Sequence, residues 1–197
     1  VVVTDATGSV TSSGAVLTLR GFYELTATMN VRRYGHTATL LADGRVLIVG
    51  GNNGGASVSS AEVYDPATRT FTPATNTMVV SRQGHAAVPL PGGRVLIVGG
   101  CVAGAIACSS FPRSIELFDP ATNAFVVPRP TAAIATARAY FSASPLLGGR
   151  VLVAGGYQNG TTITASAEIY DPATESFAPT GSMATPRAHP ATSRLPD

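Results

Sequence analysis

The chain has 197 residues, of which 45% are hydrophobic and 12% are charged, a composition that excludes an intrinsically disordered protein. Its 21 glycines and 14 prolines favour a turn-rich all-β fold over a helical one. The formal net charge is only +2, and the 13 basic residues, all arginines, are spread along the chain, whereas a nucleic-acid-binding surface shows clustered Lys and Arg. No stretch approaches the roughly 18 unbroken apolar residues that indicate a membrane span.

The first 32 residues match the rest of the chain only loosely. The opening sequence VVVTDATGSV has no Met and no basic segment before an apolar one, so it is not the start of a signal peptide. The sequence FYELTATMNVRR echoes SFAPTGSMATPR near the other end. We predict that residues 1–32 are either a leader or an atypical partial unit of the repeat that follows.

Three similar units follow, and a fourth begins. They open at Arg33, Arg82, Arg138 and Arg187, which are 49, 56 and 49 residues apart. In all three complete units, 18 residues separate the opening Arg from the second glycine of a glycine pair, and nine separate a later Glu from a Phe. Only the segment between the glycine pair and Glu and the segment between Phe and the next Arg change length. Fixed segments are structural units and variable ones are loops.

Each unit predicts four strands, which we call a to d. In the first unit they lie at 36–41 (HTATLL), 45–49 (RVLIV), 61–65 (AEVYD) and from residue 70 (TFTP). A tight Asp-Gly or Gly-Gly turn follows strand a, as in a β-hairpin. The sequence DPAT between strands c and d is also a turn, because Pro presets φ and the preceding Asp accepts backbone hydrogen bonds.

Strand b is continuously apolar, so it must be covered on both faces. In a four-stranded antiparallel unit that recurs about every 50 residues, this happens when sheets stack face to face around an axis, as in a β-propeller. A β-solenoid is disfavoured by the hairpin turns, and a sandwich by the faithful repetition of turn chemistry. The glycines that close strand b suit a sharp exit beside a packed neighbour; they are Gly50, Gly51, Gly99, Gly100, Gly155 and Gly156.

The glycine pair, the EVYDPATRTF-type segment and the opening Arg together resemble the kelch-repeat family of β-propellers. The resemblance implies complete four-stranded blades at 33–81, 82–137 and 138–186, with the first strand of a further, truncated blade at 187–197. Kelch propellers have six or seven blades, so we expect this chain to be a fragment of such a ring. One departure is that the Trp common in kelch strand d is replaced by Phe71, Phe125 and Phe177.

The recurring charged residues are predicted to be structural. We expect each opening Arg to pair with a buried glutamate of strand c, since a charge between packed blades requires partners. These glutamates are Glu62, Glu116 and Glu168. His36 and His85 recur at one phase of the repeat, where the third unit has Phe141. A position that accepts Phe indicates packing rather than catalysis.

Strand alternation places the variable b–c and d–a loops on the same side of the sheets, which we call the loop face. Binding residues concentrate on loops held by a rigid scaffold, and kelch relatives bind partners on this face. The candidate ligand-binding residues are the less repetitive ones of the b–c loops, which offer amides, an Arg and an aromatic ring to a protein or carbohydrate. They are Asn52, Asn53, Arg113, Tyr157, Gln158 and Asn159.

The longest b–c loop contains both cysteines, Cys101 and Cys108. We expect a disulfide, which would imply an oxidising compartment; the alternative is two free thiols in a reducing cell. No His lies nearby in the sequence and the spacing matches no common zinc motif, so no metal site is expected.

The sequence therefore predicts a non-catalytic kelch propeller without a cofactor that binds protein or glycan outside the cytoplasm. The lysine-free, Ala- and Gly-rich composition suggests a GC-rich bacterial genome. Self-association through open blade edges is a further expectation, because an open arc would leave apolar sheet faces in water. The alternative function is the scaffold part of a galactose-oxidase-like copper enzyme whose active site lies outside this segment.

Overall fold

A computed structural model describes residues 9–12, 15–18, 27–104, 107–126, 128 and 132–189. Within these ranges the secondary structure is β, apart from one 3-10 turn at Leu147–Gly149 (η1). An N-terminal hairpin pairs β1 (Ser9–Ser12) with β2 (Ala15–Thr18). Much of the segment 1–32, and residues 190–197 of the expected further blade, lie outside the described residues.

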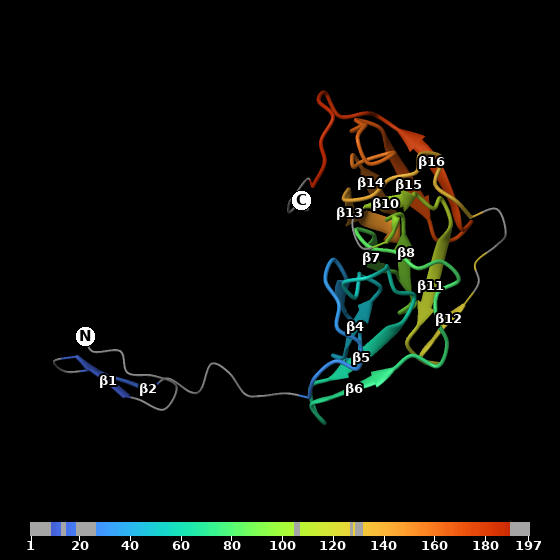
Figure 1. Ribbon diagram of the computed structural model, residues 1–197. Helices are drawn as coiled ribbons and strands as arrows, with labels where there is room; N and C mark the ends of the chain where they lie inside the picture. The colour runs from blue at the N-terminus through green and yellow to red at the C-terminus, as the bar shows by residue number, and fades with distance from the viewer. Residues whose placement is uncertain are drawn as a thin grey trace.

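Three four-stranded antiparallel sheets, called blades 1, 2 and 3, make up the body of the protein, and each is a simple meander (Figure 1). Blade 1 consists of β3 (Thr37–Leu40), β4 (Val46–Val49), β5 (Ala61–Asp65) and β6 (Thr70–Pro73). Blade 2 consists of β7 (Ala86–Pro89), β8 (Val95–Val98), β11 (Ile115–Asp119) and β12 (Ala124–Val126). Blade 3 consists of β13 (Ser142–Pro145), β14 (Val151–Ala154), β15 (Ala167–Asp171) and β16 (Ser176–Thr180).

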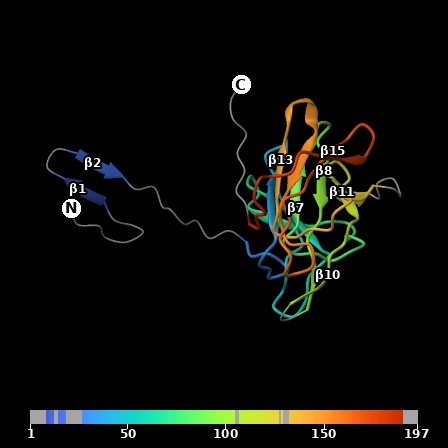
Figure 2. The ribbon, with the colours of Figure 1, turned by 90° about the horizontal axis from the view of Figure 1, so that it is seen from above.

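The blades follow one another in chain order, and their first strands β3, β7 and β13 make contact along the inner edge. Figure 2 shows the stacked sheets from above. This is the arrangement of propeller blades. A short extra hairpin, β9 (Val102–Ala103) with β10 (Cys108–Ser110), lies in the b–c loop of blade 2.

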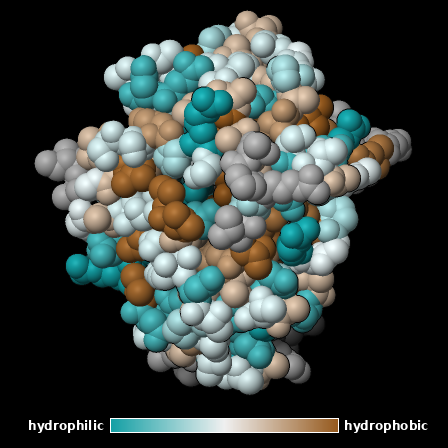
Figure 3. Space-filling model, turned by 90° about the vertical axis from the view of Figure 1, so that its right-hand side faces the viewer, coloured by the Kyte–Doolittle hydropathy of each residue, from teal (hydrophilic) through white to brown (hydrophobic). Residues whose placement is uncertain are grey.

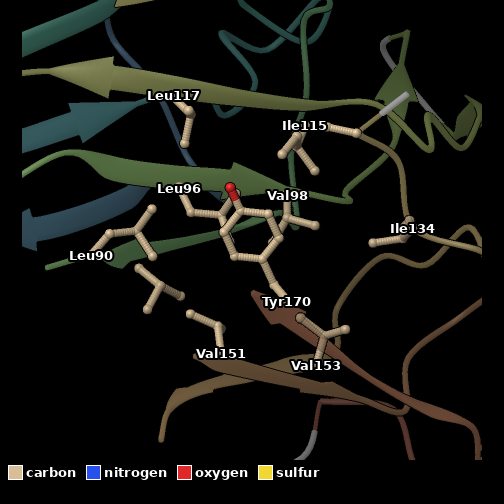
Figure 4. Packing of buried hydrophobic residues seen from close by; sticks show 11 residues of the cluster. Leu90, Leu96, Val98, Ile115, Leu117, Ile134, Val151, Val153 and Tyr170 are labelled. Carbon is tan, nitrogen blue, oxygen red and sulfur yellow. The ribbon is translucent and has the colours of Figure 1, made fainter. Parts of the chain in front are cut away.

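The apolar strand b of blade 2 is buried on both faces, as its sequence predicts. Val95 and Ile97 belong to the cluster shared with blade 1, while Leu96 and Val98 belong to the cluster shared with blade 3 (Figure 4). All four side chains have 0% exposure. Each contributes roughly 1.5–3 kcal/mol by leaving water, so the interfaces between blades hold the three sheets together. Figure 3 shows a surface on which hydrophobic groups alternate with hydrophilic ones.

The predicted burial and pairing of the repeated Arg and Glu are confirmed in the three blades, whereas the fourth opening residue, Arg187, is exposed. Arg82 Nη2 lies 3.1 Å from Glu116 Oε1, and the side chains are 0% and 6% exposed. The remaining donors and acceptors are also occupied: Nη1 of Arg82 donates to two carbonyls, and Glu116 accepts from the backbone amides of Val79 and Val80. A buried ion pair is tolerated only when its polar atoms are satisfied in this way.

The same contacts recur in blades 1 and 3, at 2.8 Å for Arg33–Glu62 and 2.9 Å for Arg138–Glu168. In blade 1 the amides that bind the carboxylate are those of Asn30 and Val31. Residues just before the first complete unit thus take the position that a d–a loop takes in the later blades.

Candidate functional site

The b–c loops of blades 1 and 2 brace each other on the loop face. The amide of Ser57 donates to the carbonyl of Ala103 at 2.8 Å, and the amide of Ala103 donates to the Ser57 hydroxyl at 2.9 Å. The Asn52 side chain adds a bond to the carbonyl of Gly104 at 3.2 Å. These bonds make this part of the loop face a rigid platform.

The long loop of blade 2 is closed by a disulfide between Cys101 and Cys108, which are seven positions apart. Cys101 is fully buried, and its backbone forms a two-way bridge with Gln83 at the entrance of blade 2. The disulfide attaches the segment that contains Cys108 and Phe111 to this buried position. That segment forms one wall of a cavity between blades 2 and 3.

A chain of backbone hydrogen bonds links the entrances of successive blades. The residue two positions after each opening Arg donates its amide to the carbonyl of its counterpart in the blade before: Gly84 to Gly35, Tyr140 to Gly84 and His189 to Tyr140, at 3.3, 2.8 and 2.8 Å. All four residues have positive φ, of 62° (Gly35), 59° (Gly84), 53° (Tyr140) and 50° (His189). Tyr140 and His189 therefore hold a backbone conformation suited to glycine although they have large aromatic side chains.

The rings at this position pack against each other and against the b–c loop of blade 3. The centroids of Tyr140 and His189 lie 4.8 Å apart with an interplanar angle of 32°, and Tyr157 meets both edge-on at 6.5 and 6.1 Å. A Cβ at Gly84 would come within 2.7 Å of the Tyr140 ring. Glycine there makes room for the first ring of the group.

These rings line a cavity of about 380 Å³ between the b–c loops of blades 2 and 3, which we call the aromatic pocket. Its described lining residues are Ala107, Cys108, Phe111, Tyr140, Tyr157, Asn159, Gly160, Thr161 and His189. A concave, mostly apolar cavity with a few polar groups is the usual form of a small-ligand site.

A buried amide lies behind the pocket. Gln83 is 9% exposed, and its Nε2 donates to the Tyr140 hydroxyl at 3.1 Å, while its Oε1 has no partner among the described residues. This contact leaves the Tyr140 hydroxyl hydrogen available for an acceptor. An unpaired buried polar atom is costly unless the site supplies a partner when it is occupied.

The structure distributes the six candidate binding residues over the loop face. Tyr157 and Asn159 line the aromatic pocket, and Gln158 lies between them, half-buried. Arg113 is exposed and donates from Nε to the carbonyl of Ile134 at 2.7 Å.

The two asparagines of blade 1 lie elsewhere on the loop face. Asn53 accepts amide bonds within its own exposed turn, and Asn52 is 1% exposed, with both ends of its amide bonded. Asn52 thus stabilises the contact between the b–c loops of blades 1 and 2 and does not face solvent.

Three ring-bearing residues of the aromatic pocket are not among the residues that the sequence suggests for binding. They are Phe111, Tyr140 and His189. A signal for the last two exists, since glycine stands two positions after the opening Arg in the first two units and an aromatic residue stands there later. Only the structure, through the positive φ, shows that side chains at this position of the repeat contribute to the pocket.

A second cavity, of about 250 Å³, lies between blades 1 and 2, where the d–a loop of blade 1 crosses blade 2. Val79, Val80, Ile115 and Phe125 give it apolar walls, and it borders the carboxylate of Glu116. The backbone amides of this loop already bind that carboxylate. This cavity is therefore part of the packing around the buried ion pair.

Two features typical of other protein classes are absent from the described residues. No group of three or more His, Cys, Asp or Glu side chains could hold a metal ion there. No helix in the same part of the chain is long and apolar enough to cross a membrane.

Comparison with known proteins agrees with this architecture. The kelch motif model matches residues 32–78 and 138–184. The solved structure titled "Structure of YjhT" superposes with a TM-score of 0.67 at 15% sequence identity, over 83% of this chain and 56% of that one. The chain thus spans little more than half the length of that structure, and no curated protein sequence matches it. Two segments of the chain thus match the kelch motif, and its three sheets have the fold of kelch β-propeller blades.

Proposed function

We propose that this protein is a non-catalytic binding module that holds a protein or glycan ligand on its loop face, outside the cytoplasm of a bacterium. The observation that carries the proposal is the aromatic pocket. Tyr140 and His189 keep positive φ at a position where Gly35 and Gly84 serve the scaffold without strain. Residues held in sparsely populated conformations concentrate at ligand-binding sites.

The disulfide supports the location. Cys101 and Cys108 are joined, and structural disulfides persist in secreted and periplasmic proteins, whereas the reducing cytoplasm keeps thiols free. The lysine-free composition supports a GC-rich bacterial source.

The arrangement of side chains favours binding over the copper-oxidase alternative. That chemistry needs a Tyr crosslinked to a Cys, and here each cysteine sulfur is already bonded to the other. The rings of Tyr140 and His189 pack against each other, tilted at 32°.

The test compares two charge insertions on opposite faces of the protein. Thr161→Arg places a bulky side chain at the aromatic pocket, and Ala67→Arg is its matched control in an exposed c–d turn. Immobilised wild type and variants are incubated with a glycan array and, separately, with a bacterial surface-protein extract whose bound components are identified by mass spectrometry.

We expect at least one class of ligand to be retained by wild type and Ala67→Arg and lost by Thr161→Arg. Equal retention by both variants, or no specific ligand in either arm, would overturn the proposed function.

We also propose that the two terminal blades present association surfaces. Val46, Tyr64 and Phe71 of blade 1 are half-buried, while their counterparts in blade 2 are buried against a neighbouring sheet: Val95, Phe118 and Phe125 are 0%, 0% and 7% exposed. A further sheet stacked on blade 1 would complete the same packing.

A further inference from the structure

We infer that the aromatic pocket is a subsite for one neutral pyranose ring of a glycan, stacked on the tyrosine rings. This inference rests on the proposed function and deepens it by naming the ligand class. Four features of the pocket carry it: size, aromatic walls, placement of hydrogen-bonding groups and lack of charge.

The size of the pocket suits a sugar ring. Its volume of about 380 Å³ is near the lower end of the roughly 300–1,000 Å³ typical of small-molecule sites. The pocket is bounded by loops of two blades, and a Cβ at Gly160 would lie 3.8 Å from the Phe111 ring. A single ring with a substituent leading out to solvent fits this space, whereas a folded peptide segment does not.

The walls offer flat apolar surface at two orientations. Tyr157 stands at 84° to Tyr140 and at 75° to His189. A pyranose ring carries its C–H groups on its faces and its hydroxyl groups around its rim. Rings set at near right angles can therefore cover a sugar face and one of its edges at the same time.

Two polar groups of the pocket residues can bond the rim hydroxyls of a stacked sugar. The Asn159 Oδ1 is occupied by the amides of Thr161 and Thr162 at 3.3 and 2.9 Å, so its amide nitrogen, unpaired within the described residues, is the available donor. The Tyr140 hydroxyl, held by Gln83, can donate to an acceptor. Sites that hydrogen-bond substrate hydroxyls discriminate strongly against analogues that lack them.

The lack of charged side chains in the pocket disfavours the two competing small-ligand classes. No Asp, Glu, Lys or Arg is among its described lining residues. A quaternary ammonium group would bind by cation–π attraction alone, without a carboxylate partner. An acidic sugar would lack the bidentate guanidinium partner that carboxylates favour.

Backbone strain provides an independent argument. A positive φ strains the backbone of a non-glycine residue, and Gly35 and Gly84 serve the fold at this position through backbone hydrogen bonds alone. Replacing Tyr140 by glycine should therefore remove the ring and relieve the strain together. The relieved strain offsets part of the ring packing and the Gln83 hydrogen bond that the variant loses, and its melting temperature shows whether it stays folded.

The experiment measures binding of three kinds of probe to the full chain by saturation-transfer NMR and titration calorimetry. The neutral probes are the methyl β-glycosides of glucose, galactose and N-acetylglucosamine; choline chloride and sodium glucuronate are the charged probes. The variants are Tyr140→Gly, Tyr157→Ala and, as matched control, Tyr34→Ala, an aromatic residue 56% exposed at a blade entrance outside the pocket.

We expect saturable binding of at least one neutral glycoside, weakened about tenfold or more by Tyr140→Gly and by Tyr157→Ala and unchanged by Tyr34→Ala. A melting temperature of Tyr140→Gly close to that of wild type would show that the loss of binding does not come from unfolding.

Preference for choline or glucuronate, or equal binding by all variants, would overturn the inference. If no glycoside binds while Thr161→Arg still abolishes capture of a surface protein, the sugar inference fails and the proposed function stands. If neither assay detects a ligand, both fail.

Discussion

At the scale of single residues, the interior of the protein contains charged and polar side chains, and residues of the repeat supply their hydrogen-bond partners. Burial alone would raise the pKa of Glu62, but hydrogen bonds from Asn30, Arg33 and Val31 outweigh it and hold that pKa below its ordinary value. The free energy that this carboxylate contributes is thus present above about pH 4.5 and lost as pH falls through the lowered pKa.

His85 gives a prediction for a separate pH range. It is 7% exposed between blades 1 and 2, and burial together with the nearby charges of Arg82 and His36 lowers its pKa from 6.5 to about 3. In the unfolded chain the same imidazole binds a proton near pH 6.5, while in the folded protein it stays neutral. Stability therefore falls as pH decreases from about 6.5 toward 3, by up to about 1.4 kcal/mol per pH unit.

The His85→Phe variant tests this, because Phe141 occupies the same position in blade 3. We expect the free energy of unfolding, from urea titrations at about pH 7 and about pH 4.5, to drop in wild type and to change much less in the variant. Equal pH dependence in the two proteins would show that His85 is not the titrating group.

The residue scale also shows which parts of the site sequence reasoning can reach. Tyr157 and Asn159 stand out because they interrupt the repeat in a loop of variable length. Tyr140 and His189 do not, because their importance depends on positive φ and on contacts between blades, which a residue's identity does not reveal. Asn52 has the composition of a binding residue, but hydrogen bonds to the neighbouring loop bury it.

At the scale of elements, the glycine pair connects strand b to the next blade. Gly99 and Gly100 have φ of 66° and 88°, and the amide of Gly100 donates to the carbonyl of Arg138 at 2.8 Å. Gly51 and Gly156 make the same bond to Arg82 and Arg187, at 2.9 and 2.7 Å. The pair is thus a joint between blades, which explains why it recurs unchanged after each apolar strand.

Two glycine-to-alanine substitutions should separate the effects of conformation and of space. A Cβ at Gly99 would lie 2.6 Å from the carbonyl oxygen of Arg138, whereas a Cβ at Gly92, in a turn with φ 85°, would meet no atom within 4 Å. We expect Gly92→Ala to lower the free energy of unfolding by about 1–2 kcal/mol through φ strain. Gly99→Ala should lower it by about 1–3 kcal/mol more, through overlap.

Urea unfolding of the two variants measures the free-energy loss from φ strain and the additional loss from steric overlap. If Gly99→Ala were no less stable than Gly92→Ala, close approach between blades would not be the reason for the glycine pair.

Strand positions are the part of the fold that the sequence predicts best. Strand c, expected at 61–65, is β5 (Ala61–Asp65), and the DPAT turn follows it with Asp65 Oδ1 accepting the amide of Ala67 at 2.8 Å. Local chemistry determines both features. The hairpin of β9 with β10 was not predicted, because it depends on how the long loop closes across the disulfide.

At the scale of the whole molecule, blade 2 is covered on both faces, while within the described part of the chain blades 1 and 3 are each covered by another sheet on one face. Leu152 and Ile169 lie on the face of blade 3 turned away from blade 2 and are half-buried. Burial of such a face beneath another sheet would remove apolar surface from water at about 25 cal/mol per Å².

We therefore expect the protein to self-associate with increasing concentration, and Ile169→Glu to weaken that association by placing a charge on the open face. Leu147→Glu is the matched control, since Leu147 is an exposed apolar residue (59%) in the turn between β13 and β14. Light scattering over a concentration series measures the mass. A monomer at all concentrations, or equal effects of the two variants, would contradict this expectation.

The series of backbone hydrogen bonds from Gly35 to His189 has an evolutionary consequence. Each blade is tied to the next at this position by main-chain atoms, so the fold does not specify the side chain there. A blade can exchange its glycine for a recognition group at a modest loss of stability and without new loops, provided that the neighbouring position leaves room for the side chain, as Gly84 does for Tyr140. A kelch ring built this way offers one variable position per blade, and two of the four positions described in this chain already hold aromatic residues.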